Sequence, residues 1–363
     1  MRGSGLPYDE SACEAVVWYG RLLRCEASPK ALALESIVSL GHSSPELDKR
    51  AISMHNARMS HAQRAQTPGN MCFVQAYAKI NLTLDVLGRR ADGYHALATV
   101  MQTIDLHDTI CLTVTDDDRV QVICTTPALS NDENLAARAA TLLRQRLALT
   151  QGVRIELHKR IPVAAGLGGG SSNAAAILLA LQQWWRLPLS PVDLLNMAAS
   201  LGSDVPFFLT GGLALCEGRG EQVTRLAPYW PEAMRWLLLL KPAIGIATAE
   251  VFRSLPASDY TDGTYSREVC SALNAGTMPR AEYLHNCLER SVLECYPEVA
   301  QAREDLLRAG ASIVRLSGSG PTLFALFPEL ARATQVQQEL QSQGYEVYLS
   351  RATRSHAGSV SFF

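Results

Sequence analysis

The stretch that decides the fold lies near the middle of the 363-residue chain and reads Ile161-Pro162-Val163-Ala164-Ala165-Gly166-Leu167-Gly168-Gly169-Gly170-Ser171-Ser172-Asn173-Ala174-Ala175-Ala176. Alternating apolar residues at 152–161 predict a strand before it, and an alanine-rich segment predicts a helix after it, to about Trp185. Four glycines in five positions remove Cβ atoms, so backbone N–H groups can approach a bulky anion. The helix directs its unpaired N–H groups and positive dipole end at the same point. We therefore predict a loop that binds a triphosphate, with Ser171 and Ser172 as additional donors.

Two other kinds of glycine loop do not fit. A Walker A loop requires Gly-Lys-Ser/Thr, and no lysine occurs between Lys159 and Lys241. A dinucleotide fold requires an early βαβ unit with an acidic residue about twenty positions further on, where this chain has Leu187-Pro188-Leu189. A turn that merely packs a helix tightly on a sheet stays open as an alternative, but it does not account for the two serines.

A lysine and a carboxylate flank this loop in the sequence. Residues 73–87 alternate as one long strand ended by Gly88, which places Lys79 on one face with Asn81 and Thr83. Alone, such a lysine is typical of a solvated face. Asp204 follows a helix-ending glycine and precedes a strongly apolar run that we expect to be extended. A half-buried carboxylate needs a partner, and a lysine-paired carboxylate is a good proton acceptor. A cap or turn role for Asp204 stays open.

The remaining patterns predict a second domain and an N-terminal extension. Residues 14–40 have loose helical periodicity and 55–70 are polar, so 1–70 form an extension of unknown role before the strand that Met71 opens. Residues 190–201 predict a helix with Ser190 as its N-cap. The last third predicts, in order, strand 236–240, helix 248–255, an irregular stretch, helix 298–309, strands 312–316 and 322–327, helix 328–343 and strand 345–350. That order suits a split-βαβ, ferredoxin-like domain.

The turn at 316–322, with two glycines and three hydroxyls, is predicted to be a tight hairpin or a contact for phosphate or for the first loop. Other predicted elements are strands at 98–104, 109–115 and 120–124 and a helix at 134–147.

Composition narrows the class of protein. A formal net charge of −2 gives no global basic field for nucleic acid or an anionic membrane. No apolar run approaches the ~18 residues of a membrane span, and the N-terminus has no signal pattern, so we expect a cytoplasmic protein. The nine cysteines are odd in number and lack CxxC spacing, which favours reduced thiols over zinc or disulfides.

Together, the Lys79 strand, the Pro-x-x-x-Gly-Leu-Gly-Gly-Gly-Ser-Ser loop and the Ser-Gly-Ser-Gly turn resemble the motifs of the GHMP kinase superfamily. The resemblance covers about residues 73–350 and is closest to the branch that phosphorylates a cytidyl diphosphate sugar alcohol. It implies an α+β, two-domain GHMP kinase fold, with a ribosomal-S5-domain-2-like ATP domain at 71–230 and a ferredoxin-like domain at 231–355. The stretches that distinguish the branch are Ala78-Lys79-Ile80-Asn81-Leu82, Arg89-Arg90-Ala91-Asp92-Gly93-Tyr94-His95, Gly202-Ser203-Asp204-Val205-Pro206-Phe207 and Glu217-Gly218-Arg219-Gly220-Glu221.

The resemblance also implies roles for individual residues. Asp204 takes the proton of the substrate hydroxyl and Lys79 pairs with it. Tyr94 and Phe252 bracket the cytosine, His95 reads its edge, and Asn81 and Thr248 line the substrate channel. ATP and Mg²⁺ are the implied cofactors, but no residue matches an acidic Mg²⁺ ligand, and a monomer or a homodimer is expected. The implied ATP site comprises Pro162, Val163, Ala164, Ala165, Gly166, Leu167, Gly168, Gly169, Gly170, Ser171 and Ser172, with Asn134, Leu135 and Lys159 at the adenine end.

Two alternatives stay open. A different kinase of the superfamily would have no base to stack, which the Tyr94-His95 pair argues against. A nucleotide-binding regulator without turnover would be marked by loss of Lys79 or Asp204, and both are present.

Overall fold

The first sheet is organised around one long strand. The computed structural model describes residues 71–227, 229–353 and 359–362, so the predicted extension at 1–70 lies outside the described residues. Strand β3 (His95–Thr115) pairs antiparallel with β1 (Met71–Asn81) along one edge and with β5 (Gly152–His158) and β6 (Leu213–Gly218) along the other. The path runs β12-β1-β3-β5-β4. Its other strands are β2 (Asp85–Arg89), β4 (Val120–Cys124), β7 (Gln222–Arg225) and β12 (Ser359–Phe362).

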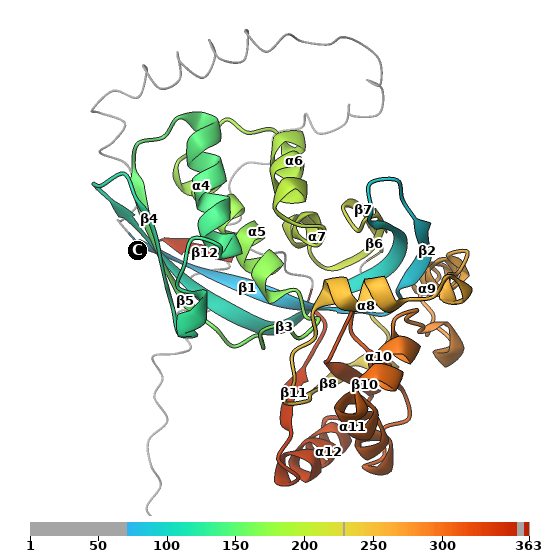
Figure 1. Cartoon of the computed structure of the whole chain (residues 1–363). Helices are drawn as coiled ribbons and strands as arrows, with labels where there is room; N and C mark the ends of the chain where they lie inside the picture. The colour runs from blue at the N-terminus through green and yellow to red at the C-terminus, as the bar shows by residue number, and fades with distance from the viewer. Residues whose placement is uncertain (1–70, 228, 354–358, 363) are drawn as a thin grey trace, which may run out of the picture. The chain divides into compact units, whose positions relative to one another are not determined.

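Four helices accompany this sheet, and Figure 1 shows α4, α5 and α6 together on one side of it. Helix α5 (Gly169–Trp184) packs against β1 and α4, with Ala174, Ala175 and Ala176 fully buried. Small side chains let its backbone approach the strands, which brings its first turn to the edge of the site. The other helices are α4 (Leu135–Leu147), α6 (Pro191–Leu201), with the predicted Ser190 cap, and α7 (Val205–Thr210).

The second sheet has the order β11-β8-β10-β9, with every pair antiparallel. Its strands are β8 (Trp236–Lys241), β9 (Val314–Leu316), β10 (Leu323–Phe327) and β11 (Glu346–Ser350), and α11 (Pro297–Arg308) and α12 (Leu330–Ser342) provide the crossovers. This is the split-βαβ arrangement, so the ferredoxin-like prediction is confirmed. Leu237 and Leu239 of β8 share a buried cluster with Ile80 and Leu82, so the two sheets are joined by a common core.

Several local predictions were wrong, each for a long-range reason. The predicted strand at 73–87 breaks after Asn81, because Leu84 pairs with the distant segment around Asn286. The two predicted strands at 98–104 and 109–115 form one strand, because β1 spans both halves. The apolar run after Asp204 is the helix α7, and β6, β7 and β12 were not predicted. The predicted helix at 248–255 is α8 (Thr248–Ser254), whereas the stretch after it, predicted to be irregular, contains α9 (Thr264–Asn274) and α10 (Glu289–Cys295).

The cysteines of the described residues are free, and most are buried. Burial raises the pKa of Cys72 to about 12 and that of Cys270 to about 11, so these thiols carry no thiolate at neutral pH. Among the described helices, none has both the length and the apolar character of a membrane span.

Candidate active site

Lys79 enters the site from an irregularity in β1. The pairing of β1 with β3 shifts register between Tyr77 and Lys79, and there the backbone N–H of Lys79 donates to Leu167 O at 3.0 Å. Such a bulge re-aims a side chain. The Lys79 side chain is 4% exposed, so it does not lie on the solvated face that its strand pattern alone would suggest.

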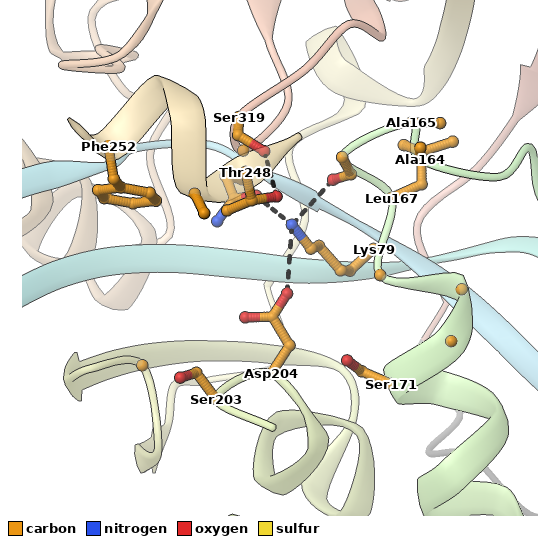
Figure 2. A pocket seen from close by; sticks show the side chains of 18 of the residues that line it. Lys79, Ala164, Ala165, Leu167, Ser171, Ser203, Asp204, Thr248, Phe252 and Ser319 are labelled. Atoms are coloured by element: carbon orange, nitrogen blue, oxygen red, sulfur yellow. Dashed lines mark hydrogen bonds and ion pairs between the residues drawn. The ribbon is translucent and has the colours of Figure 1, made fainter. Parts of the chain in front are cut away.

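Three acceptors surround the Lys79 ammonium. Its Nζ lies 2.5 Å from Asn81 Oδ1, 2.9 Å from the carbonyl oxygen of Gly166 and 3.6 Å from Asp204 Oδ2. Figure 2 shows Lys79 reaching from β1 toward Asp204, with Thr248 and Ser319 on its other side. Burial lowers the pKa of Lys79, and the Asp204 carboxylate opposes that lowering. The charge of the ammonium therefore depends on its ion pair with Asp204.

Asp204 precedes α7 in the N-cap position but makes no capping hydrogen bond with its side chain. The cap alternative is therefore wrong for the carboxylate. Its side chain is 31% exposed and lines the same cavity as Lys79. One carboxylate oxygen faces the ammonium, and the exposed fraction leaves the group able to accept a proton from a bound molecule.

The glycines of the loop serve two different purposes. Gly166 has φ +75°, and a Cβ there would lie 2.2 Å from Ser317 O. Gly168 has φ +70°, and its Cβ would lie 2.7 Å from Phe208 Cζ and 3.1 Å from Lys79 Cγ. These two positions are glycine because the protein itself packs against them. At Gly170 a Cβ would meet only Leu135 Cδ1, at 3.4 Å, so this backbone is open toward the cavity.

Asp108 of β3 anchors the loop, and no local sequence pattern predicts this role. This fully buried carboxylate accepts from the backbone N–H groups of Arg160 and Ile161, at 2.7 and 2.8 Å, and from Asn173 Nδ2 at 2.9 Å. It also pairs with Lys159, whose Nζ lies 3.3 Å from Asn173 Oδ1. The strand before the loop and the first turns of α5 are thus fixed to one point of β3.

The predicted adenine end gathers around the start of α4. Asn134 caps that helix: its Oδ1 accepts from Ala136 N at 2.9 Å, and its Nδ2 donates to Leu129 O at 2.8 Å. Leu135 follows it and approaches Gly170. Asn134, Leu135 and Lys159 all line the cavity, although the polar atoms of Asn134 are already occupied within the protein.

An aromatic group forms the other end of the cavity. The rings of His95 and Phe252 lie 5.4 Å apart at 30°, and Tyr260 OH lies 3.3 Å from His95 Nε2. Tyr94 is 53% exposed, with the guanidinium of Arg219 5.0 Å from its ring centre. Burial, and then the charge of Arg89, lower the pKa of His95, which keeps the ring neutral near pH 7. Tyr260 was missed because it lies in the stretch predicted to be irregular.

One cavity of about 1230 Å³ brings these groups together. Its volume exceeds the roughly 300–1,000 Å³ typical of a single small-molecule pocket. Every predicted site residue lines it except Ser172, which is fully buried and donates its backbone N–H to Gly168 O. The cavity therefore has room for two ligands, with Lys79 and Asp204 lining the same space as the glycine loop and the aromatic group.

Comparisons with known proteins agree with this architecture. The sequence profile described as the GHMP kinases N terminal domain matches residues 134–212, and that of the GHMP kinases C terminal matches residues 271–346. A solved structure of 4-(cytidine 5'-diphospho)-2C-methyl-D-erythritol kinase has a TM-score of 0.66 and 33% identity, covering 77% of this chain and all of that one. Homoserine kinase from Cytophaga hutchinsonii shares the fold, with a TM-score of 0.63 at 20% identity, covering 82% of this chain and 99% of that one.

Curated relatives are similar over most of their own length. The 4-diphosphocytidyl-2-C-methyl-D-erythritol kinase of Brevibacillus brevis is 38% identical over 289 residues, which cover 79% of this chain and 98% of the relative. The protein of the same name from Pelotomaculum thermopropionicum is 42% identical over 278 residues, or 76% of this chain and 96% of the relative. The chain belongs to the GHMP kinases and, within them, to the 4-diphosphocytidyl-2-C-methyl-D-erythritol kinase family.

Proposed function

We propose that the chain transfers the γ-phosphoryl group of ATP to the 2-hydroxyl of 4-diphosphocytidyl-2-C-methyl-D-erythritol, giving the 2-phosphate and ADP. This is a step of the non-mevalonate route to isoprenoid precursors. The observation that carries the proposal is the single cavity in which the Lys79–Asp204 pair, the glycine loop and the aromatic group meet. The names of the relatives supply the substrate.

The proton and the phosphoryl group move at the Lys79–Asp204 pair. As the substrate oxygen attacks the γ-phosphorus, its proton passes to a carboxylate oxygen of Asp204, the new P–O bond forms, and the bond from the γ-phosphorus to the bridging oxygen of ADP breaks. Lys79 pairs with the Asp204 carboxylate at 3.6 Å and holds its orientation. Such transfers depend mainly on positioning and on stabilised charge, and the anchored loop provides the positioning.

The phosphates of ATP would bind along the open part of the loop, at the N-terminal end of α5. Gly169, Gly170 and Ser171 line the cavity there, whereas Ser172 is left out because its hydroxyl is buried. Among the described residues no group of three His, Cys, Asp or Glu side chains could hold a metal. A cavity with so few charged ligands fits a Mg²⁺ ion that keeps most of its ligands on phosphate and water. The Ser171 hydroxyl is the protein oxygen that would hold it. When bound, Mg²⁺ neutralises charge on the transferred phosphoryl group.

The cytidyl end of the substrate would lie among the aromatic residues. Tyr94 and Phe252 offer ring faces for stacking, and His95, whose Nε2 faces Tyr260 OH, offers its Nδ1 to the edge of the base. Asn81 and Thr248 line the path from there to Lys79. The partners in this proposal are ATP and this small molecule, and a cytoplasmic location is part of it because the reaction consumes ATP.

A coupled ADP-release assay tests the proposal. We expect turnover with the cytidyl substrate and only background release with homoserine or mevalonate. Turnover with either control and none with the cytidyl substrate would place the chain with another kinase of the superfamily. ATP binding without turnover on any of the three would favour a regulator.

A further inference from the structure

The turn of residues 317–322, which joins β9 to β10, lies against the glycine loop. Ser317 Oγ donates to Gly166 O at 3.1 Å, and Thr322 N donates to Ala165 O at 3.3 Å. The Gly166 carbonyl that accepts from Ser317 is the same one that accepts from Lys79 Nζ. The turn of the second sheet and the lysine of the first sheet therefore fix one carbonyl group of the loop.

Gly318 brings this turn onto Lys79 itself. Its φ is +58°, and a Cβ there would lie 3.1 Å from Lys79 Nζ and 3.2 Å from Asn81 Oδ1. No side chain fits between this turn and the ammonium. A small displacement of the turn would change both the packing around Lys79 and the position of Gly166 O.

Asn286 holds the turn in place. Its side chain is 4% exposed, and its Nδ2 donates to Leu316 O at 2.9 Å and to Gly318 O at 2.8 Å. Its Oδ1 accepts from Leu288 N at 2.9 Å, so both ends of the amide are used. The two N–H groups of one side-chain amide thus bind the two carbonyl groups at the start of the turn.

The backbone around Asn286 is in turn fixed to the first sheet. Leu84 N donates to His285 O at 2.8 Å, and Cys287 N donates to Leu84 O at 2.9 Å. Leu84 lies three residues after Asn81, the acceptor for the Lys79 ammonium. Asn286 therefore connects the turn to the strand region that carries Lys79, and fixes the position of one relative to the other.

We propose that Asn286 is a positioning residue for phosphoryl transfer, acting through the 317–322 turn on the Gly166 carbonyl and the Lys79 ammonium. It does not line the cavity, so its effect on the reaction is transmitted by the turn. The role in transfer rests on the proposed function, whereas the role in holding the loop does not.

Kinetics of substituted proteins test the first part. Asn286→Asp keeps the shape and the acceptor for Leu288 N but turns a carboxylate oxygen toward two carbonyl groups. We expect kcat to fall by roughly 10- to 100-fold, since about 1 Å of misplacement can cost about 100-fold. KM for ATP should rise several-fold. KM for the cytidyl substrate should rise less, because the turn reaches that side of the cavity through the contact of Ser319 Oγ with Thr248 Oγ1 at 2.8 Å and not through the Gly166 carbonyl.

Arg315→Met is the matched control. Arg315 donates from β9 to the carbonyl groups of Val314 and Ala281, at 2.8 and 2.9 Å, and to that of Leu284. Its loss removes hydrogen bonds from the same region without touching the turn. We expect a lower melting temperature with kcat and both KM values near those of the parent protein. Equal kinetic losses in Arg315→Met, or unchanged kinetics in a folded Asn286→Asp protein, would overturn the proposal.

Hydrogen exchange tests the second part without any reaction. In Asn286→Ala, amide exchange should rise across residues 163–168 and 317–322, whereas Arg315→Met should affect only residues 281–284. If neither Asn286→Ala nor Asn286→Asp folds, Asn286→Ser, which keeps one donor, replaces them and should show a smaller change in the same segments. Unchanged exchange across residues 163–168 in the Asn286 variants would overturn the proposal, even if the parent enzyme is active. If the variants show the expected rise in exchange but the parent protein has no kinase activity, only the proposed reaction is refuted.

Discussion

At the scale of single residues, the site depends on one buried cation, Lys79, which has several protein acceptors and lines the cavity. The Lys79 ammonium contacts Asn81 Oδ1 and Gly166 O and lies close to Gly318, and the Asp204 carboxylate compensates its charge. Breaking a largely buried pair on one side leaves the other charge uncompensated. Substitution of either partner should therefore change both kcat and the pH dependence of activity.

Replacing Asp204 tests the proton acceptor. Asp204→Asn keeps the shape and removes the basic oxygen, so we expect kcat to fall by about 100-fold or more while ATP still binds. Asp118→Asn, on the exposed connection between β3 and β4, is the control and should retain full turnover. Near-normal turnover in a folded Asp204→Asn protein would refute the assignment.

The pH dependence tests the electrostatic link. Burial holds the pKa of Lys79 below its ordinary value of 10.5, and Asp204 counteracts this. Removing the carboxylate therefore lowers the pKa of Lys79 further, and the ammonium is lost at a lower pH. The fall of activity on the alkaline side should begin at lower pH in Asp204→Asn than in the parent protein. A pH profile of residual kcat measures this, and an unchanged alkaline side would contradict the link.

At the scale of elements, the loop and α5 combine packing with openness to a ligand. Gly166 and Gly168 are required by the neighbouring turn and by Phe208, whereas Gly170 faces the cavity. The packing alternative considered for the loop was thus partly correct. It explains Gly166 and Gly168 and also applies to Gly169, whose Cβ would lie 3.0 Å from Ile161 Cγ2, and it leaves Gly170 open for phosphate.

Two alanine substitutions separate these uses. Gly168→Ala should lower the free energy of unfolding by about 2 to 4 kcal/mol, from a left-handed φ and overpacking against Phe208. Gly170→Ala should leave stability unchanged or raise it by up to about 1 kcal/mol, because alanine favours a helix, yet raise KM for ATP. Denaturant unfolding and steady-state kinetics measure both. Equal stability losses would show that Gly170 is also a packing position.

The aromatic group of α8 and the start of β3 gives a further test. Phe252→Ala and Tyr94→Ala should each weaken the binding of the cytidyl substrate by about 1–3 kcal/mol, which is the contribution of a base stacked on an aromatic ring. KM for ATP should stay nearly constant. Tyr94→Phe keeps the ring and serves as the control. If KM for ATP rises equally, these rings are packing residues and the substrate end has been misplaced.

The sequence predicted the elements whose signals are local and missed those whose cause lies far along the chain. The Ser190 cap, helix α5 and the order of the second sheet follow from short patterns. The break after Asn81 depends on the pairing of Leu84 with the segment around Asn286. No sequence pattern near Leu84 predicts this pairing. For the same reason Asp108, Tyr260 and Asn286 could not be placed: a buried polar side chain is recognised by its partners, and those partners come from distant strands and turns.

At the scale of the whole molecule, the region similar to known kinases is smaller than the chain. The 289 residues matched by the Brevibacillus brevis enzyme cover 98% of that enzyme but only 79% of this chain. The described strands begin at Met71. The boundaries predicted for the extension and for the two domains remain predictions.

A chain that starts at Met71 tests the extension. We expect it to fold, to melt within a few degrees of the full-length protein and to keep its turnover, because a segment joined by a polar tether is separable. Thermal melting and the ADP-release assay compare the two proteins. An insoluble or inactive product would show that residues 14–40 belong to the fold.

The pairing of β12 with β1 has a consequence for how the protein is made. The strand that carries Lys79 is synthesised long before β12, which pairs with Cys72–Gln75 along its outer edge. Until β12 leaves the ribosome, the nascent chain exposes unpaired backbone along β1, and such edges template aggregation. Contacts between such distant parts of a chain also form slowly. This edge of the ATP-binding sheet is thus completed only after the strands and helices between β1 and β12 have been made.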